Sequence, residues 1–171
     1  MTGLVRKATG LDLEKIAQIG AEAFSGLRPI ENGREWVSAC FAAGPRMEYW
    51  VAEVEGQILG YILWTEKGGF RTDAVVELEQ IAVIARQRRT GIGRTLITES
   101  LRGVAERILN RGARLKLIEV TTGSEQNAVE FYHRVLGTEV TARLPDYFRG
   151  DEYILLARTA FERSPKIDTP Q

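Results

Sequence analysis

Residues 77–110 read ELEQIAVIARQRRTGIGRTLITESLRGVAERILN, and this stretch decides the expected fold. An apolar run that ends at Ile84 has the composition of a strand. A basic segment with two glycines, Gly91 and Gly93, follows it, and a helical pattern begins there. The apolar residues of that helix recur on one face: Leu96, Ile97, Leu101, Val104, Ala105 and Ile108. We therefore predict a strand, a basic glycine turn and a buried helix in that order.

The glycine turn has the features of an anion-binding site. The first turn of a helix leaves backbone N–H groups unpaired and carries the positive end of the helix dipole. That dipole disfavours the arginines Arg88, Arg89 and Arg94 unless an anion lies among them. Gly91 and Gly93 allow the backbone to approach such a ligand closely. A phosphate or pyrophosphate fits this pattern, and a solvated basic loop is the alternative.

Length and composition indicate one globular domain. The chain has 171 residues, of which 44% are hydrophobic and 27% charged, and its 23 basic residues balance 23 acidic ones. A net charge of zero does not favour nucleic acid as a partner. The single cysteine, Cys40, cannot form an internal disulfide. No apolar run approaches the roughly 20 residues of a membrane span, so we expect a soluble cytoplasmic protein without membrane contact.

The predicted elements follow each other with short connections. Strands are expected at 4–8, 49–54, 57–64, 75–84, 115–121, 138–143 and 152–158. Helices are expected after the capping box of Thr9 and Asp12, at 34–43, at the central helix that ends at Gly112, and at 127–135. The helical crossover makes 115–121 run parallel to 75–84. The domain covers residues 1–161, and residues 162–171 form a polar, disordered tail.

The central stretch resembles a known family. The run IAVIARQRRTGIGRTL is similar to the acetyl-coenzyme A binding motif of the GNAT N-acetyltransferase superfamily, with Arg88, Gly91 and Gly93 in the motif's places. Downstream, AVEFYHRVLG resembles the family's second signature through Phe131 and Tyr132. The resemblance covers nearly the whole chain. It implies a single GNAT-like domain of the α/β (α+β) class: a mixed sheet of about six or seven strands, antiparallel with one parallel splayed pair, flanked by about four helices.

The resemblance also implies an activity and a co-substrate. It implies an N-acetyltransferase that passes an acetyl group directly from acetyl-coenzyme A to a primary amine of a small molecule or a peptide, without a metal. By analogy, the main chain of residues 81–83 binds the pantetheine arm and polarises the thioester carbonyl. The backbone N–H groups of residues 88–93 hold the pyrophosphate. The implied coenzyme-binding residues are Ile81, Ala82, Val83, Arg88, Arg89, Thr90, Gly91, Ile92, Gly93, Arg94, Asn127 and Tyr132.

One acid and one base are needed for this transfer. Tyr132 resembles the family's tyrosine that protonates the coenzyme sulfur, and its alternative is an aromatic packed on an amphipathic helix. The base candidates are Glu77, Glu79 and Glu119, of which we favour Glu119. His133 lies about 100° around the helix from Tyr132, so we do not assign it a catalytic role.

Two departures from the family pattern leave a second hypothesis open. Glu125 stands where the family often has a pantetheine-contacting Asn, and Asn127 comes two residues later. Thr138 replaces the usual Phe after Gly137. The alternative function is therefore a catalytically inactive acyl-coenzyme A binding regulatory module. Family members often dimerise, and the sequence leaves a homodimer open.

Overall fold

The computed structural model describes residues 4–24, 29–69, 71–123, 126–148 and 150–159. Within these residues the chain forms seven strands, four α-helices and two short 3-10 helices. Their bounds are β1 Leu4–Lys7, η1 Gly10–Asp12, α1 Leu13–Ala23, α2 Ile30–Ala42, β2 Met47–Val54, β3 Gln57–Lys67, β4 Asp73–Val83, η2 Ala85–Gln87, α3 Ile92–Asn110, β5 Arg114–Gly123, α4 Gln126–Leu136, β6 Glu139–Leu144 and β7 Glu152–Arg158. The predicted tail at 162–171 lies outside the described residues.

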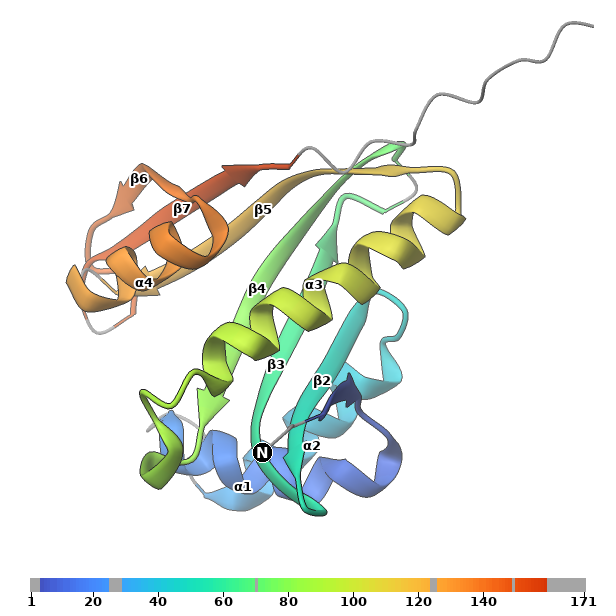
Figure 1. Ribbon diagram of the computed structural model, residues 1–171. Coiled ribbons are helices and arrows are strands. Elements are labelled where there is room, and N and C mark those ends of the chain that lie inside the picture. The colour runs from blue at the N-terminus through green and yellow to red at the C-terminus, as the bar shows by residue number, and fades with distance from the viewer. Residues whose placement is uncertain (1–3, 25–28, 70, 124–125, 149, 160–171) are drawn as a thin grey trace, which may run out of the picture.

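The strands form one mixed sheet in the order β1-β2-β3-β4-β5-β7-β6. Every neighbouring pair is antiparallel except β4 and β5, which are parallel because α3 carries the chain across between them. Figure 1 shows α3 and α4 on one face of the sheet and α1 and α2 on the other. The predicted fold class, including its single parallel pair, is confirmed.

Helix α3 supplies the largest part of the core. All six residues of its predicted apolar face are buried, and they pack on Ile62 and Trp64 of β3 and on β4 and β5. Burying each such side chain contributes roughly 1.5–3 kcal/mol relative to exposure. Ser100 is buried on the same face, and its Oγ accepts a 2.7 Å hydrogen bond from Trp64 Nε1. The sequence pattern therefore identified the helix face correctly and missed only this polar contact.

Two arginines near the end of α3 bind buried carboxylates on the sheet. Arg107 lies 2.6 Å from Glu48 of β2 and 3.0 Å from Glu66 of β3, and Arg111 Nη1 also donates to Glu66 at 2.9 Å. Both glutamates are almost fully buried. An unpaired buried charge is strongly destabilising, so these ion pairs fix the helix over β2 and β3.

The parallel pair separates halfway along its length. β4 pairs with β5 from Asp73 opposite Arg114 to Leu78 opposite Val120. Beyond these residues β4 pairs only with β3 and β5 only with β7. Figure 1 shows the two strands diverging, with α4, β6 and β7 following β5. The predicted splayed pair is therefore present, and each diverging strand has one unpaired backbone edge there.

The second helix is longer than predicted. It begins at Ile30 rather than at residue 34, directly after Pro29, whose carbonyl accepts a hydrogen bond from Asn32 N at 3.1 Å. Asn32 and Gly33 are poor helix formers, which is why the sequence favoured a later start. Gly33 is buried in the structure, so tertiary packing overrides its low propensity.

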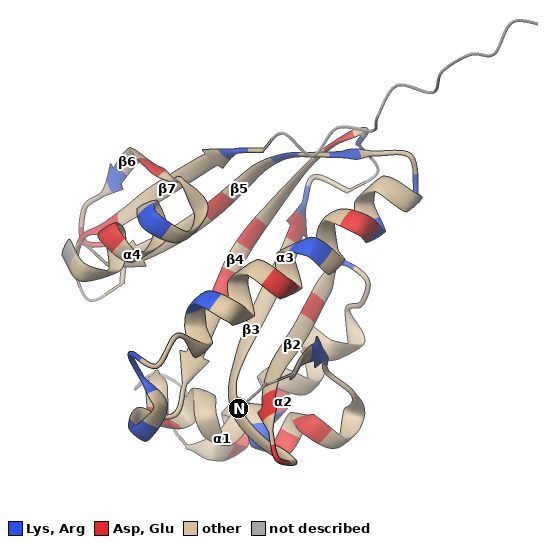
Figure 2. Cartoon of the chain, viewed as in Figure 1, with Lys and Arg blue, Asp and Glu red and all other residues tan. Residues whose placement is uncertain are grey.

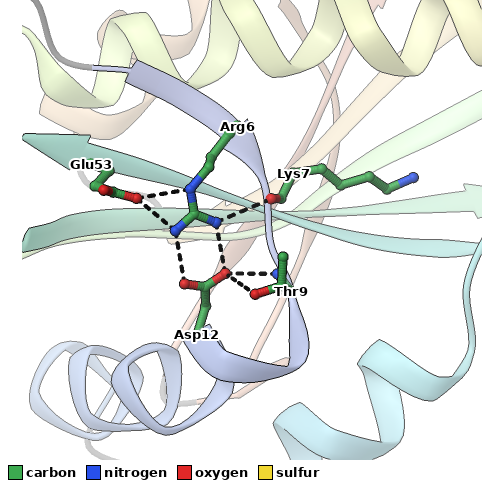
Figure 3. Close-up of polar contacts among 5 residues, drawn as sticks. All are labelled: Arg6, Lys7, Thr9, Asp12 and Glu53. Carbon is green, nitrogen blue, oxygen red and sulfur yellow. Dashed lines mark hydrogen bonds and ion pairs between the residues drawn. The ribbon is translucent and has the colours of Figure 1, made fainter. Parts of the chain in front are cut away.

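An ion-pair cluster joins the first strand to the first helix (Figure 3). Arg6 of β1 binds both oxygens of buried Asp12 at 2.7 and 2.9 Å and also binds Glu53 of β2 at 2.8 Å. Asp12 accepts further hydrogen bonds from the backbone N–H and the hydroxyl of Thr9, which completes the predicted capping box. These contacts, the Arg6 hydrogen bonds first, lower the pKa of Asp12 to about 2 although burial opposes the shift.

Removing this carboxylate charge should lower stability in a pH-dependent way. The pKa of Asp12 is depressed from 3.8 to about 2, so its contribution is full above pH 3.8 and is lost as the pH falls through 2. We expect Asp12→Asn to cost about 2 kcal/mol at pH 7, since one pKa unit corresponds to about 1.4 kcal/mol. Urea unfolding at pH 7, 5 and 3 measures the difference in free energy of unfolding between the wild type and Asp12→Asn. A difference that does not become smaller towards pH 3 would contradict the lowered pKa of Asp12.

A glycine in the middle of α3 makes room for a tryptophan. A Cβ at Gly103 would lie 2.2 Å from Cη2 of Trp50, too close for any real contact. Alanine is normally about 1 kcal/mol better than glycine inside a helix, but overpacking costs about 1–3 kcal/mol. We expect Gly103→Ala to lower the free energy of unfolding in the wild type. In a Trp50→Leu background the same change should raise it, and destabilisation in both backgrounds would exclude the steric explanation.

Candidate active site

A pocket lies beside the separated end of β4, where the sequence predicts the coenzyme. It has a volume of about 330 Å³ and is bounded by the strand, the glycine turn and α4. Its lining residues are Ile81, Val83, Gln87, Arg88, Arg89, Gly91, Gly93, Arg94 and Phe131. Three arginines at one end and apolar side chains at the other suit a ligand with a charged phosphate part and an apolar arm.

The backbone of the glycine turn is arranged to bind an anion. Arg89 and Gly91 both have left-handed backbone geometry, with φ of 65° and 95°. The first backbone N–H bonded back into the turn is that of Thr95, which donates to Gly91 O at 3.0 Å. Within the described part of the chain, the N–H groups of residues 89–94 have no acceptor. Unpaired donors at a helix N-terminus suit an anion, so the predicted pyrophosphate cradle remains a prediction that this backbone geometry supports.

Not every predicted coenzyme residue lines this pocket. Thr90 and Ile92 line a neighbouring apolar pocket on the β1–β3 side of the α3 N-terminus rather than this one. The side chain of Ala82 is buried against α1 and α2, and its main chain pairs with Tyr61 of β3, so Ala82 presents no free backbone group to the pocket. Asn127 is exposed in the first turn of α4 and is not among the described lining residues.

Tyr132 lies on α4, on the same face of the sheet as α3. It packs against the main core, and its ring meets that of Phe131 edge to face at a centroid distance of 5.3 Å. Burial raises the pKa of Tyr132 to about 12. The hydroxyl therefore keeps its proton at neutral pH and can donate it. Its neighbour His133 is 61% exposed, and its Nδ1–H donates to Thr138 O at 2.8 Å, away from the pocket.

The three predicted glutamates lie on the opposite face of the sheet. Glu77 and Glu119 are direct partners in the parallel register, one pair before the strands separate. Figure 2 shows acidic residues on both β4 and β5 in this part of the sheet. Lys67, the last residue of β3, binds both carboxylates, with Nζ 2.9 Å from Glu77 Oε2 and 2.6 Å from Glu119 Oε1. The sequence analysis did not identify Lys67. Lys67 follows Thr65 by two residues on β3, so the two side chains share this face of the sheet.

Glu79 occupies an irregular position in β4. The β3–β4 register shifts there, because Leu63 pairs with Gln80 while Trp64 pairs with Leu78. Glu79 is left between these pairs, and its carboxylate accepts a hydrogen bond from the Thr65 hydroxyl. After this bulge Ile81 and Val83 face α3, whereas Glu77 and Glu79 face α1 and α2. Because of this bulge, one strand presents carboxylates on one face of the sheet and apolar residues on the other.

The sequence also offers possible acceptor contacts, each of which is otherwise an ordinary solvated side chain, and the structure describes only part of this set: Arg28, Glu31, Arg34, Asp146, Tyr147 and Arg149. Arg28 and Arg149 lie outside the described residues. Arg34 binds Glu14 of α1 at 2.7 Å and lies near Glu31, so it is held in a surface ion pair. Tyr147 is 54% exposed in the turn between β6 and β7.

Two further features concern the described part of the chain. None of its helices is both long enough and apolar enough to span a membrane. No group of three or more His, Cys, Asp and Glu side chains in these residues is arranged to hold a metal ion.

Comparisons with known proteins agree with this geometry. Residues 13–138 match the model of the acetyltransferase (GNAT) family. An N-alpha-acetyltransferase of Sulfurisphaera tokodaii is 28% identical over 164 residues, which is 90% of each chain. Among solved structures, a ribosomal-protein-alanine N-acetyltransferase from Brucella melitensis is 24% identical with a TM-score of 0.69, over 91% of this chain and 99% of that one. Arabidopsis thaliana NAA60 in complex with acetyl-CoA is 16% identical with a TM-score of 0.71, over 92% and 98%.

The family match covers well over half of the chain, and the two structural neighbours share its fold. The anion cradle, the apolar pocket and the separated strands are the parts of the chain that suit the coenzyme. The chain belongs to the acetyltransferase (GNAT) family and is an acyltransferase with acetyl-coenzyme A as its co-substrate.

Proposed function

We propose that this enzyme acetylates the α-amine at the N-terminus of a peptide or protein, in a ternary complex with acetyl-coenzyme A. The observation that carries the proposal is the opening between β4 and β5, with Tyr132 on one face of the sheet and the Glu77–Glu119 pair on the other. The N-alpha-acetyltransferase of Sulfurisphaera tokodaii favours a peptide over a small-molecule amine as the acceptor.

The coenzyme would enter from the α3 and α4 face. Its pyrophosphate would accept hydrogen bonds from the N–H groups of residues 89–94, and the arginines beside them would balance its charge. The pantetheine arm would then lie along the free edge of β4 at Ile81 and Val83. A backbone N–H of this edge would donate to the thioester oxygen, which becomes an oxyanion when the amine attacks.

The acceptor would approach from the face that carries the carboxylates. A peptide amine is protonated in solution, so a carboxylate near the opening both attracts it and removes its proton, directly or through water. Glu119 is our first choice for this role, and Glu77 and Glu79 are the alternatives. Attack of the neutral amine forms the C–N bond and leaves a positive charge on the nitrogen, which gives its second proton to water. Collapse of the tetrahedral intermediate then breaks the C–S bond.

Tyr132 would supply the proton for the departing sulfur. Its hydroxyl is protonated at neutral pH, and burial, which raises its pKa to about 12, holds the proton more firmly still. The proton passes to the coenzyme thiolate as the C–S bond breaks, and solvent restores it afterwards. Acid and base therefore act from opposite faces and meet only at the opening between the strands.

A coenzyme-release assay with an amine panel tests the proposal. Peptides with free N-termini should be acetylated, whereas the same peptides with blocked N-termini and small amines should not. We expect Tyr132→Phe to lower kcat by about 10²–10⁴-fold, the usual size of a general-acid contribution, with coenzyme affinity unchanged. Calorimetric titration with coenzyme A supplies the second measurement.

Three outcomes would contradict parts of this proposal. Turnover with small amines alone would replace the peptide acceptor. Full activity of Tyr132→Phe would remove the assigned acid. Tight coenzyme binding without turnover on any amine would favour the regulatory module that the positions of Asn127 and Thr138 suggested.

The coenzyme pocket can be tested through Gly93, because one substitution there should change stability and binding in opposite directions. A Cβ at Gly93 would lie 3.6 Å from Phe131 and 4.0 Å from Ile81 and Val83, so it fits the fold but enters the pocket. Gly93→Ala should raise the free energy of unfolding by about 0.5–1 kcal/mol. It should also weaken coenzyme A binding about tenfold or more, which corresponds to about 1.4 kcal/mol.

Thr98→Ala is the matched control on the exposed side of α3. It should leave coenzyme affinity unchanged, as measured by titration calorimetry beside urea unfolding. Unchanged affinity in Gly93→Ala would show that the coenzyme does not pass this residue.

A further inference from the structure

Lys67 is the one cation among the described residues that contacts the candidate base pair. Its Nζ lies 2.6 Å from Glu119 and 2.9 Å from Glu77, and the two carboxylates are only 19% and 18% exposed. Glu79, two residues along β4, has a neutral partner instead, the Thr65 hydroxyl. The three carboxylates and one ammonium leave this part of the acceptor face negatively charged.

Two carboxylates that are direct strand partners repel each other when both are ionised. In such a pair the first charge opposes formation of the second. A cation placed between them removes that penalty. Partial burial acts to lower the pKa of Lys67, but its bonds to Glu119 and Glu77 outweigh it and raise the pKa, so the ammonium is retained at neutral pH.

We infer that Lys67 is a positioning residue that keeps Glu77 and Glu119 ionised together, so that the pair can take up the acceptor's proton at neutral pH. This inference deepens the proposed function and rests on it for the catalytic part. The role belongs to Lys67 because it ends β3 beside β4, and its side chain reaches across β4 to Glu119 of β5.

Other charged or titratable groups on this face must be kept constant in a test. By register Asp73 of β4 and Arg158 of β7 share the face with Glu77 and Glu119, and Glu79 lies further along β4. Cys40 of α2 and Tyr49 of β2 interact electrostatically with Glu79. None of these groups changes in the variants below.

The experiment compares Lys67→Met and Lys67→Arg by carboxyl NMR and by the pH profile of kcat/KM. The carboxyl carbon signals of Glu77 and Glu119 change with pH, and the midpoint of that change is the measured quantity. In Lys67→Met this midpoint should lie about one pH unit or more above its wild-type value. The acid limb of kcat/KM should move in the same direction. Lys67→Arg, which restores a cation, should return both towards the wild-type position.

Lys116→Met is the matched control, because Lys116 is also a sheet lysine and its ammonium binds Asp73 at 3.3 Å. It removes the same charge and should leave both readouts unchanged. Unmoved carboxyl signals in Lys67→Met, or an equal shift in Lys67→Arg, would overturn the inference. So would lower turnover at every pH with a fixed acid limb, which is the signature of a purely structural role.

The NMR readout separates this inference from the proposed function. It needs no substrate, so it tests the ionisation of the carboxylate pair even if no amine is turned over. An absence of turnover with a shift in the NMR signals would overturn the proposed function and retain Lys67 as the residue that sets the charge of the pair.

Discussion

The pairing of β4 with β5 ends at Leu78 and Val120, and the whole site depends on that point. If the strands stayed paired, the sheet would be a continuous wall between α3 and α4 on one side and α1 and α2 on the other. Their separation leaves free backbone donors and acceptors, which need partners elsewhere. A bound coenzyme can supply those partners, and in the proposed mechanism the opening lets groups on opposite faces act on one reaction centre.

The separation requires that each strand is held firmly on its other side. β4 stays paired with β3 as far as Val83, and β5 stays paired with β7 as far as Gly123. Helix α3 is fixed over β2, β3 and β4 by its buried apolar face and by the arginine pairs with Glu48 and Glu66. Its N-terminus is therefore held at a constant position beside the end of β4, where the anion cradle forms.

Charges divide the site into two chemically different halves. The coenzyme side is positive and apolar, with three arginines at the turn and Ile81, Val83 and Phe131 along the pocket. The opposite face of the sheet, which we propose as the acceptor side, carries Glu77, Glu119 and Lys67. A bulge at Glu79 permits this division within a single strand, because it changes which residues of β4 face each side.

The sequence by itself predicted the order of the elements and the parallel pair, which the structure confirms, and the glycine turn as an anion site, because these follow from local patterns: hydrophobic period, glycine position and helix-end chemistry. It identified Tyr132 and the three glutamates as candidates, but it could not show that Glu77 and Glu119 are opposed or that Lys67 joins them. Those facts depend on strand register, which involves residues 10 to 52 positions apart in the chain. Only the tertiary structure decided them, because a carboxylate's ionisation is set by the charges that folding brings beside it.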